Sequence, residues 1–304
     1  MNRRQFLCTA GAFAGWSGGV ACRPLAGAST FDRALVLVDL NGGNDGVNTV
    51  IPIGDPLYRA LRPTLAVPEE QVLTLDARTG LHPSLLPLLG AWRGQELAIV
   101  QGVGHDACNR SHFRSRQIWD TASDPHEYRD DSWFANAGVP LARSSPAGSF
   151  AASCEDAARS IAQREAAVAR IALHGFDTHE SQASRHAALL GQLAKGLMVL
   201  RAQLIASGDW HRTLVMTSSD FGRSVRENAA GGTDHGAAAA HFLMGGNVRG
   251  GLWGAAPRLD ALEADEGIPV TLDFRQLHAT ACAHLGVVPS SSVERFAPLP
   301  LLRA

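Results

Sequence analysis

Charge of one sign and long apolar runs are both scarce in this sequence. Its 304 residues carry 27 Lys and Arg against 29 Asp and Glu, a formal net charge of −2 at pH 7. A chain so close to neutral has no electrostatic reason to bind nucleic acid or an anionic membrane surface. No stretch approaches the roughly 20 apolar residues that a membrane-spanning helix needs. We therefore expect neither nucleic-acid binding nor stable membrane insertion.

Cysteine is also scarce, with five residues in all. Cys8 and Cys22 lie in the N-terminal stretch, which leaves Cys108, Cys154 and Cys282 for the rest of the chain. An odd number permits at most one internal disulfide, and the spacing resembles no zinc knuckle. We predict that these three are small core residues.

The N-terminus has the order of an export signal. Arg3-Arg4-Gln5-Phe6-Leu7 precedes a stretch of small and apolar residues from Cys8 to Ala21, and Ala26-Gly27-Ala28 offers a cleavage site. Adjacent arginines followed by Phe and Leu suggest the twin-arginine route. We predict that residues 1–28 are a twin-arginine signal peptide that engages the twin-arginine export machinery, so that the mature chain is periplasmic or secreted. A lipid anchor on Cys22 is the alternative to cleavage.

The remaining residues, 29–304, alternate strand and helix patterns and are predicted to form one large α/β domain. Short apolar runs predict buried strands at residues 34–40, 97–101, 168–173, 213–217 and 241–244. Helices are predicted at residues 84–92, 111–119, 155–165, 189–204 and 274–285, the fourth of these from leucines spaced by three and four. Strands alternating with helices indicate a three-layer sandwich around a mostly parallel sheet.

Acidic and imidazole side chains follow several of the predicted strands or lie in glycine-rich loops. They are Asp45, Asp177, His179, Asp220 and His235. In a parallel sheet the exit loops of neighbouring strands meet at one edge, where open α/β sheets bind ligands. Carboxylates and imidazoles without matching Lys or Arg are typical ligands of a divalent metal. We predict that the five converge on a site for one or two divalent ions (Zn, Mn, Mg or Ca), although each alone also suits a turn or a surface position.

Ser111 stands where a helix is predicted to begin, after the second predicted strand. A serine at that position is most often a helix cap. The same position suits a nucleophile, because a helix N-terminus stabilises an alkoxide and attracts an anionic substrate, and a nearby metal would lower the pKa of the hydroxyl. We predict that its neighbours Asn109, Arg110 and His112 contact a phosphate or sulfate oxygen.

Two other patterns compete with this interpretation. Gly102-Val103-Gly104-His105-Asp106-Ala107 matches a dinucleotide-binding fingerprint, but the apolar helix that should follow it is missing, so we expect no nicotinamide site. Arg223 lies close to Asp220 in the sequence and could form an ion pair with it, which would make Asp220 a structural residue.

Five segments recur in this order in a known family: Gly42 to Gly46, Asn109 to Phe113, Gly175 to His179, Ser219 to Arg223 and Thr233 to Gly236. On these segments the chain resembles the exported bacterial family catalogued as domain of unknown function fifteen-oh-one, of the alkaline phosphatase and sulfatase superfamily. The resemblance extends over nearly the whole mature chain. It implies an alkaline phosphatase-like fold with a parallel sheet between helices, a bimetal site at strand ends, and a Ser or Thr nucleophile at a helix start.

The resemblance also implies how the ligands are divided between two ions. The implied ligands are Asp177, His179 and His235 for one ion, and Asp45, Asp220 and the Ser111 hydroxyl for the other. Phe221 stands where the superfamily usually places a histidine beside the aspartate. The second ion would therefore have one ligand fewer here.

The sequence as a whole predicts an exported, metal-dependent hydrolase of phosphate or sulfate esters. Its substrate would be a small anionic ester, attacked by Ser111. The alternative is a non-catalytic exported protein that binds a metal or another ligand on the same fold. Bound metal would not separate the two, whereas loss of turnover in Ser111→Ala would.

Overall fold

The computed structural model describes residues 31–105, 110–134, 139–143, 148–263 and 267–303. By its contacts the chain divides into residues 1–30 and a second unit of residues 31–304. The predicted signal peptide lies outside the described residues, as do Cys108 and Asn109. Those assignments stay predictions.

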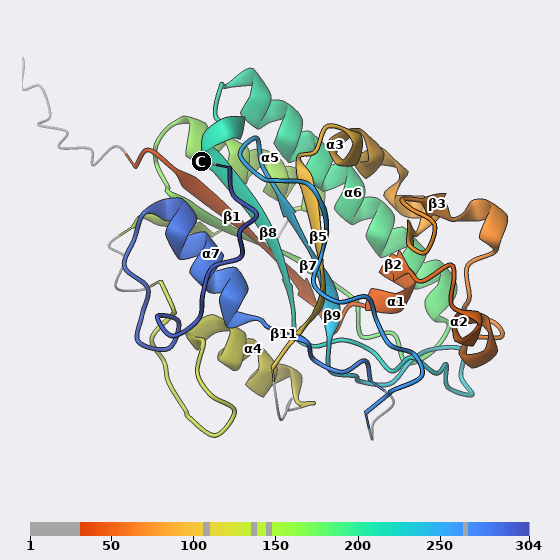
Figure 1. Ribbon diagram of the computed structural model, residues 1–304. Helices are drawn as coiled ribbons and strands as arrows, with labels where there is room; N and C mark the ends of the chain where they lie inside the picture. The colour runs from red at the N-terminus through yellow and green to blue at the C-terminus, as the bar shows by residue number, and fades with distance from the viewer. Residues whose placement is uncertain (1–30, 106–109, 135–138, 144–147, 264–266, 304) are drawn as a thin grey trace, which may run out of the picture. The chain divides into compact units, whose positions relative to one another are not determined.

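A mostly parallel sheet forms the centre of the second unit (Figure 1). Its strands are β1 (Ala34–Asn41), β5 (Leu97–Gly104), β6 (Leu141–Arg143), β7 (Val168–His174), β8 (Thr213–Ser219), β9 (Ala239–Met244), β10 (Gly251–Trp253) and β11 (Leu272–Asp273). Their order is β10-β5-β9-β8-β1-β7-β6, with β11 also paired to β5. Among the described strands of this sheet, β9 alone pairs antiparallel with its neighbours. The predicted α/β class is confirmed.

Helices cover both faces of the sheet and give the three predicted layers (Figure 1). One face carries η2 (Pro83–Leu88), α3 (Leu89–Arg93), α5 (Phe150–Ala162) and α6 (Gln182–Ala206). The other carries α4 (His112–Thr121) and α7 (Arg275–Leu285). Alternate residues of β1 serve the two cores: Val36 packs in the cluster with α5 and α6, and Leu35 in the cluster with α4 and α7. This is the period of two that a strand buried on both faces requires.

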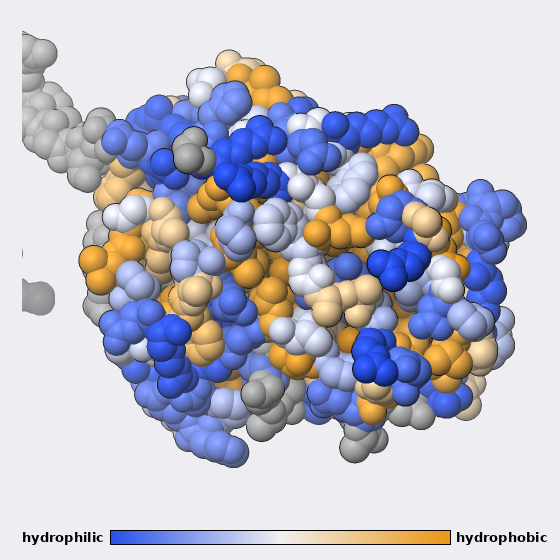
Figure 2. Space-filling model, in the orientation of Figure 1, coloured by the Kyte–Doolittle hydropathy of each residue, from blue (hydrophilic) through white to orange (hydrophobic). Residues whose placement is uncertain are grey.

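Helix α6 is the one described helix that is long and apolar enough, by length and composition alone, to cross a membrane. Its leucines from Leu189 to Leu204 are buried in the core cluster that it shares with α5 and the sheet. That burial accounts for its composition as a core helix. The face in Figure 2 mixes hydrophilic and hydrophobic residues.

A small region, residues 46–81 between β1 and β5 in the chain, has elements that the sequence did not predict. It contains α1 (Gly46–Thr49), α2 (Pro56–Leu61), η1 (Glu69–Gln71) and the three-stranded sheet formed by β2 (Val50–Ile51), β4 (Gly80–Leu81) and β3 (Leu73–Thr74). Another short helix, η4 (Trp210–Arg212), precedes β8. Two-residue strands are too short to show any periodicity, which is why the sequence did not predict them.

The predicted long elements are present, with shifted ends. Helix α5 begins earlier than predicted because Ser149 caps it, accepting a hydrogen bond from the Ala152 amide at 3.2 Å. Cys154 and Cys282 are buried and free, in the core clusters on opposite faces of the sheet. The prediction that they are small core residues is confirmed for these two.

Candidate metal centre

The exit loops of three adjacent strands meet at one edge of the sheet. Strand β1 pairs in parallel with both β8 and β7, and Leu40 is level with Ser219. Beyond β1, Gly42 has a φ of +119° and donates its amide to Asp220 Oδ2 at 3.2 Å. A Cβ atom on Gly42 would lie 2.3 Å from the Asp177 amide nitrogen, so only glycine lets these loops approach so closely.

His112 enters this edge from the first turn of α4. Its Nδ1 lies 2.6 Å from Asp220 Oδ2, and its Nε2 lies 3.4 Å from Asp177 Oδ2. Among the described residues, this buried Nε2 has no hydrogen-bond partner. A carboxylate that accepts from one ring nitrogen leaves the other free to bind a metal, which is how many metal-binding histidines are held.

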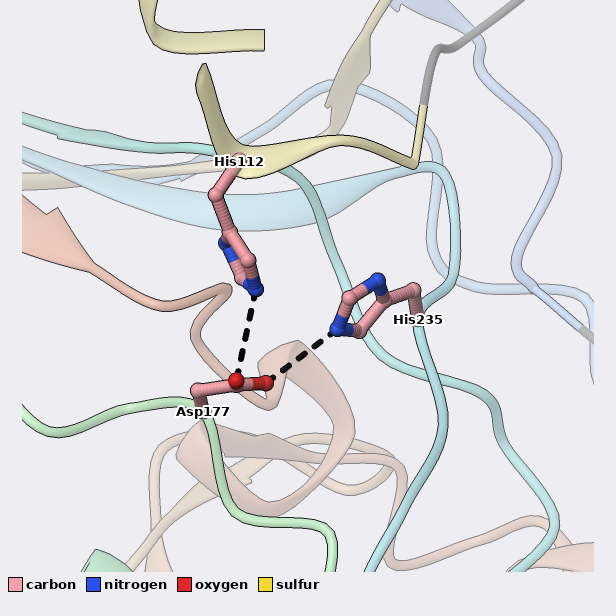
Figure 3. Close-up of side chains that lie close together, drawn as sticks. All are labelled: His112, Asp177 and His235. Atoms are coloured by element: carbon pink, nitrogen blue, oxygen red, sulfur yellow. Dashed lines mark hydrogen bonds and ion pairs between the residues drawn. The ribbon is translucent and has the colours of Figure 1, made fainter. Parts of the chain in front are cut away.

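His235 lies beside His112 and faces the other oxygen of the same carboxylate (Figure 3). Its Nδ1 lies 3.0 Å from the carbonyl oxygen of Arg110 and must donate to it, because a carbonyl only accepts. Its Nε2 is thereby left with a lone pair, 3.2 Å from Asp177 Oδ1. Burial lowers the pKa of His235, which favours the neutral imidazole that a metal requires.

His179 adds a third imidazole. Its Nε2 lies 3.0 Å from both Asp177 Oδ1 and His235 Nε2, and its Nδ1 lies 3.2 Å from Asp234 Oδ1. Like His112, His179 has one carboxylate beside its Nδ1, here Asp234, and Asp177 beside its Nε2. We define the His–Asp cluster as His112, Asp177, His179 and His235.

The spacing and chemistry of the His–Asp cluster fit a divalent cation. Donor atoms of His112, Asp177 and His235 all lie within 4.8 Å of one another. A tetrahedral zinc site, with bonds of 2.0–2.2 Å, separates its ligand atoms by about 3.3 Å. The cluster separations between 3.0 and 3.4 Å are close to that value.

Arg223 fixes the carboxylate at the centre of this cluster. Its guanidinium is buried and donates to Asp177 Oδ1 at 2.7 Å, to the Gly43 carbonyl at 2.9 Å and to the Thr233 carbonyl at 3.1 Å. Burial raises the pKa of Asp177, but the close contact with the His235 ring and the charge of Arg223 outweigh it, so that pKa is lowered overall. The ion pair considered for Arg223 is thus made with Asp177, and the alternative partner Asp220 bonds to His112 instead.

Phe221 and Asp220 both contact His112, the first through its ring and the second through a hydrogen bond. The Phe221 ring packs 4.8 Å from the His112 ring and 4.4 Å from the His235 ring, between centroids. Asp220 is buried, and burial raises its pKa, although the hydrogen bond to His112 acts the other way. Phe221 stands at the position where the resemblance led us to expect a histidine. His112 supplies an imidazole next to the Phe221 ring.

Asp45 does not belong to the His–Asp cluster. Its buried carboxylate accepts from Arg62 at 2.6 and 3.0 Å and from the Gln182 side chain at 2.5 Å. It also caps α1 by accepting from the Val47 and Asn48 amides. Burial raises its pKa, but the Arg62 charge and hydrogen bonds outweigh that and lower the pKa. A metal at Asp45 would have to displace Arg62.

Ser111 is exposed and directly precedes α4. Its side chain makes no capping hydrogen bond to α4, so the geometry does not support the helix-cap interpretation. On either side in the chain lie Arg110, whose carbonyl accepts from His235, and His112 of the cluster. Its role as nucleophile, and those of Arg110 and His112 toward substrate, stay predictions.

The five sequence-predicted ligands therefore separate into three groups: those in the cluster, Asp220 behind His112, and Asp45 outside the cluster. Asp177, His179 and His235 come together in the cluster, and Asp220 reaches it through His112. His112 was predicted to contact substrate, and no sequence signal distinguished that role from metal binding. Arg62 was missed because it lies in an irregular stretch, 17 residues from Asp45.

Several solved structures resemble this one at low identity. The lipoteichoic acid synthase LtaP from Listeria monocytogenes gives a TM-score of 0.48 at 9% identity, covering 89% of this chain and 76% of its own. A protein in the alkaline phosphatase superfamily from Vibrio parahaemolyticus gives 0.49 at 10%, covering 90% and 70%. A 2-O GAG sulfatase gives 0.47 at 10%, covering 88% and 73%.

No curated protein matches the sequence at a significant level. A family model described as protein of unknown function (DUF1501) matches residues 120–301. That span includes three of the five segments on which the resemblance rests, from Gly175 to Gly236, and excludes the other two, Gly42 to Gly46 and Asn109 to Phe113. The chain belongs to the DUF1501 family of proteins of unknown function.

Proposed function

We propose that this protein is an exported hydrolase of phosphate or sulfate esters that works with one divalent ion in the His–Asp cluster. The observation that carries the proposal is the arrangement of His112 and His235. Each has its Nδ1 engaged, by Asp220 and by the Arg110 carbonyl respectively, and each has its Nε2 directed at Asp177 (Figure 3). Both imidazoles are thus fixed in orientation, and each has its Nε2 placed to bind the same metal ion.

The cluster supplies the ligands for such an ion. We assign four groups as its ligands: His112 Nε2, His179 Nε2, His235 Nε2 and the Asp177 carboxylate. Three imidazoles with one carboxylate favour zinc over magnesium or calcium, which prefer oxygen ligands. When bound, a divalent ion polarises an ester oxygen and lowers the pKa of a coordinated hydroxyl or water.

The surrounding residues have separable roles in this proposal. Ser111 Oγ attacks the phosphorus or sulfur atom, the alcohol leaves, and water then cleaves the serine ester. The positive end of α4 stabilises the developing negative charge. Asp220 keeps the proton of His112 on Nδ1, and Arg223 prevents Asp177 from rotating away from the cluster.

A non-catalytic role is the second candidate. Arg223 and Arg62 already offset the charges of Asp177 and Asp45 with fixed cations. A protein that only binds a metal or an anion at this edge would need no exposed hydroxyl at Ser111. Turnover that depends on Ser111 therefore decides between the two.

The test combines metal analysis with ester hydrolysis. Protein purified from the periplasm is analysed for bound metal and assayed with aryl phosphate and aryl sulfate, with and without added Zn²⁺. His112→Ala and His235→Ala should lose both metal and turnover, and His126→Ala, at an exposed histidine outside the cluster, should lose neither. Metal retained at wild-type levels in both cluster variants would refute the assignment, and a metal-loaded protein that cleaves no ester would favour the non-catalytic role.

A further inference from the structure

A cavity of about 450 Å³ lies beside the candidate metal centre, a size within the usual range for small-molecule sites. It lies along the carboxyl ends of β1 and β7 and is bordered by α4, β6, α5 and α6. Its polar lining includes Asn41, Arg116, Arg143, Ser153, His174 and Gln192.

The cavity is continuous in its lining with the edge that carries the His–Asp cluster. A smaller hollow shares Asn41 and Arg116 with it and extends to Asp220. Asp220 in turn bonds to His112 of the cluster. A ligand whose ester group reacts at the cluster can therefore place its other end in the cavity.

The cavity floor holds one cation between two carboxylates. Arg170 lies 2.6 Å from Asp39 and 2.5 Å from Asp120, and all three line the cavity. Arg170 is therefore already paired without a ligand, and the floor alone offers no free cation to an anion.

Two further arginines leave the cavity with a positive charge. Arg116 donates its Nε to the His112 carbonyl at 3.2 Å, and its guanidinium lies 5.4 Å from the Phe113 ring. Neither contact is with a carboxylate. Arg143 is exposed at the end of β6 and forms no ion pair within the described residues. An anionic group in the cavity would therefore find two guanidinium groups for which the described residues show no ion pair.

The rest of the lining suits hydroxyl groups. Asn41 and His174 hydrogen-bond to each other at 3.2 Å, and both present side chains that can donate and accept. Ser153 and Gln192 add a hydroxyl and an amide from the helices. Side chains of this kind recognise a ligand with several hydroxyls better than an apolar one, because apolar groups would leave them unpaired.

We propose that this cavity binds the alcohol part of the substrate, and that this part is a polyol, such as a sugar, carrying a second anionic group held by Arg143. The inference rests on the proposed function, since it assigns the alcohol of the ester that the cluster would cleave. Arg116 then lies between the two anionic ends, because it lines both the cavity and the hollow that reaches Asp220.

The test compares three probes by titration calorimetry with metal-loaded protein. Phenyl phosphate has no hydroxyls and no second anion, glucose 6-phosphate has hydroxyls, and 6-phosphogluconate has hydroxyls and a carboxylate. We expect affinity to rise in that order. Arg143→Gln should weaken 6-phosphogluconate binding about tenfold and leave glucose 6-phosphate unchanged, because one charge-assisted contact is lost. Arg258→Gln, at an exposed arginine paired with Asp260, is the control.

A second variant tests the cavity without removing a charge. Gln192 is exposed at the cavity border, so Gln192→Trp should narrow the cavity while the protein still folds. It should weaken both sugar probes and spare phenyl phosphate. Equal binding of glucose 6-phosphate and 6-phosphogluconate by the wild type, or no binding of either, would overturn the proposal. If the affinities follow the expected order but no ester is hydrolysed, the proposed function fails while the ligand class stands.

Discussion

Arg62 and Asp45 form a doubly hydrogen-bonded ion pair in which neither side chain reaches solvent. Arg62 also donates to the carbonyls of Ser224 and Val225 and to the side-chain oxygen of Asn48, so its three remaining donors are used within the protein. The resemblance to a two-metal superfamily made Asp45 a ligand of a second ion. In this structure Arg62 takes the place of a cation beside Asp45, and that is why the proposed function uses one ion.

Removing the cation of this pair should strongly destabilise the fold. Arg62→Met leaves the Asp45 carboxylate buried and unpaired, which typically costs about 3–5 kcal/mol. Chemical denaturation measures the free energy of unfolding, with Arg258→Met at an exposed pair as the control, which should change little. A loss in Arg62→Met no larger than in the control would mean that Asp45 has another partner.

Gly42 should be indispensable for the approach of the β1 and β7 exit loops. An alanine there must adopt a φ of +119° and place Cβ 2.3 Å from the Asp177 amide. Gly208→Ala is a matched control, because it also has a positive φ, of +79°, but open space around the new methyl group. Backbone strain alone costs about 1–3 kcal/mol, so Gly42→Ala should lose clearly more stability and also metal affinity. Equal losses would show that the loops can move apart freely.

Ser111→Ala should separate catalysis from stability. Because Ser111 makes no capping bond to α4, we expect its loss to change the free energy of unfolding by less than the about 1 kcal/mol typical of a helix cap. Metal content should be retained, since the cluster ligands are untouched, while hydrolysis of aryl esters should stop. Activity that survives in Ser111→Ala would exclude the covalent route.

Stability should fall in mild acid because of buried histidines. His241 is buried, its Nδ1 donates to the Thr217 carbonyl at 3.1 Å, and burial lowers its pKa from 6.5 to about 4. The unfolded chain therefore binds the proton more strongly. The contribution of His241 is complete above pH 6.5 and is lost as the pH falls to about 4, about 3 kcal/mol in all.

The measurement is the free energy of unfolding at several pH values between 7 and 4. His241→Gln can keep the hydrogen bond to Thr217 but cannot take up a proton. The difference between wild type and this variant should shrink toward low pH. A difference that stays constant over the range would mean that His241 titrates normally.

The elements predicted from sequence are those with long periodic patterns. The leucines from Leu189 to Leu204 predicted α6, and the apolar run of residues 168–173 predicted β7, which extends to His174. Edge strands such as β6 have three residues, which is too short for an alternation of apolar and polar residues to be recognised. Parallel strands also implied that their exit loops would meet, and for Asp177 and Asp220 they do.

The site could be predicted where residues follow a strand directly or lie in a glycine-rich loop. Asp177 and His179 follow β7, His235 lies in such a loop, and all three belong to the cluster. His112 reaches the cluster from α4, and Arg62 reaches Asp45 from an irregular stretch. Those contacts depend on how distant segments pack, which no local pattern encodes, so the sequence could neither assign His112 to the metal nor remove Asp45 from it.

The central claim is that a single ion binds in the His–Asp cluster of His112, Asp177, His179 and His235. Anomalous diffraction at the zinc edge from crystals grown with Zn²⁺ tests it most directly, because it locates the ion and counts its sites. We predict one strong peak per chain, at about 2.0–2.2 Å from the Nε2 atoms of His112 and His235. A peak at Asp45, or no peak at the cluster, would contradict the account.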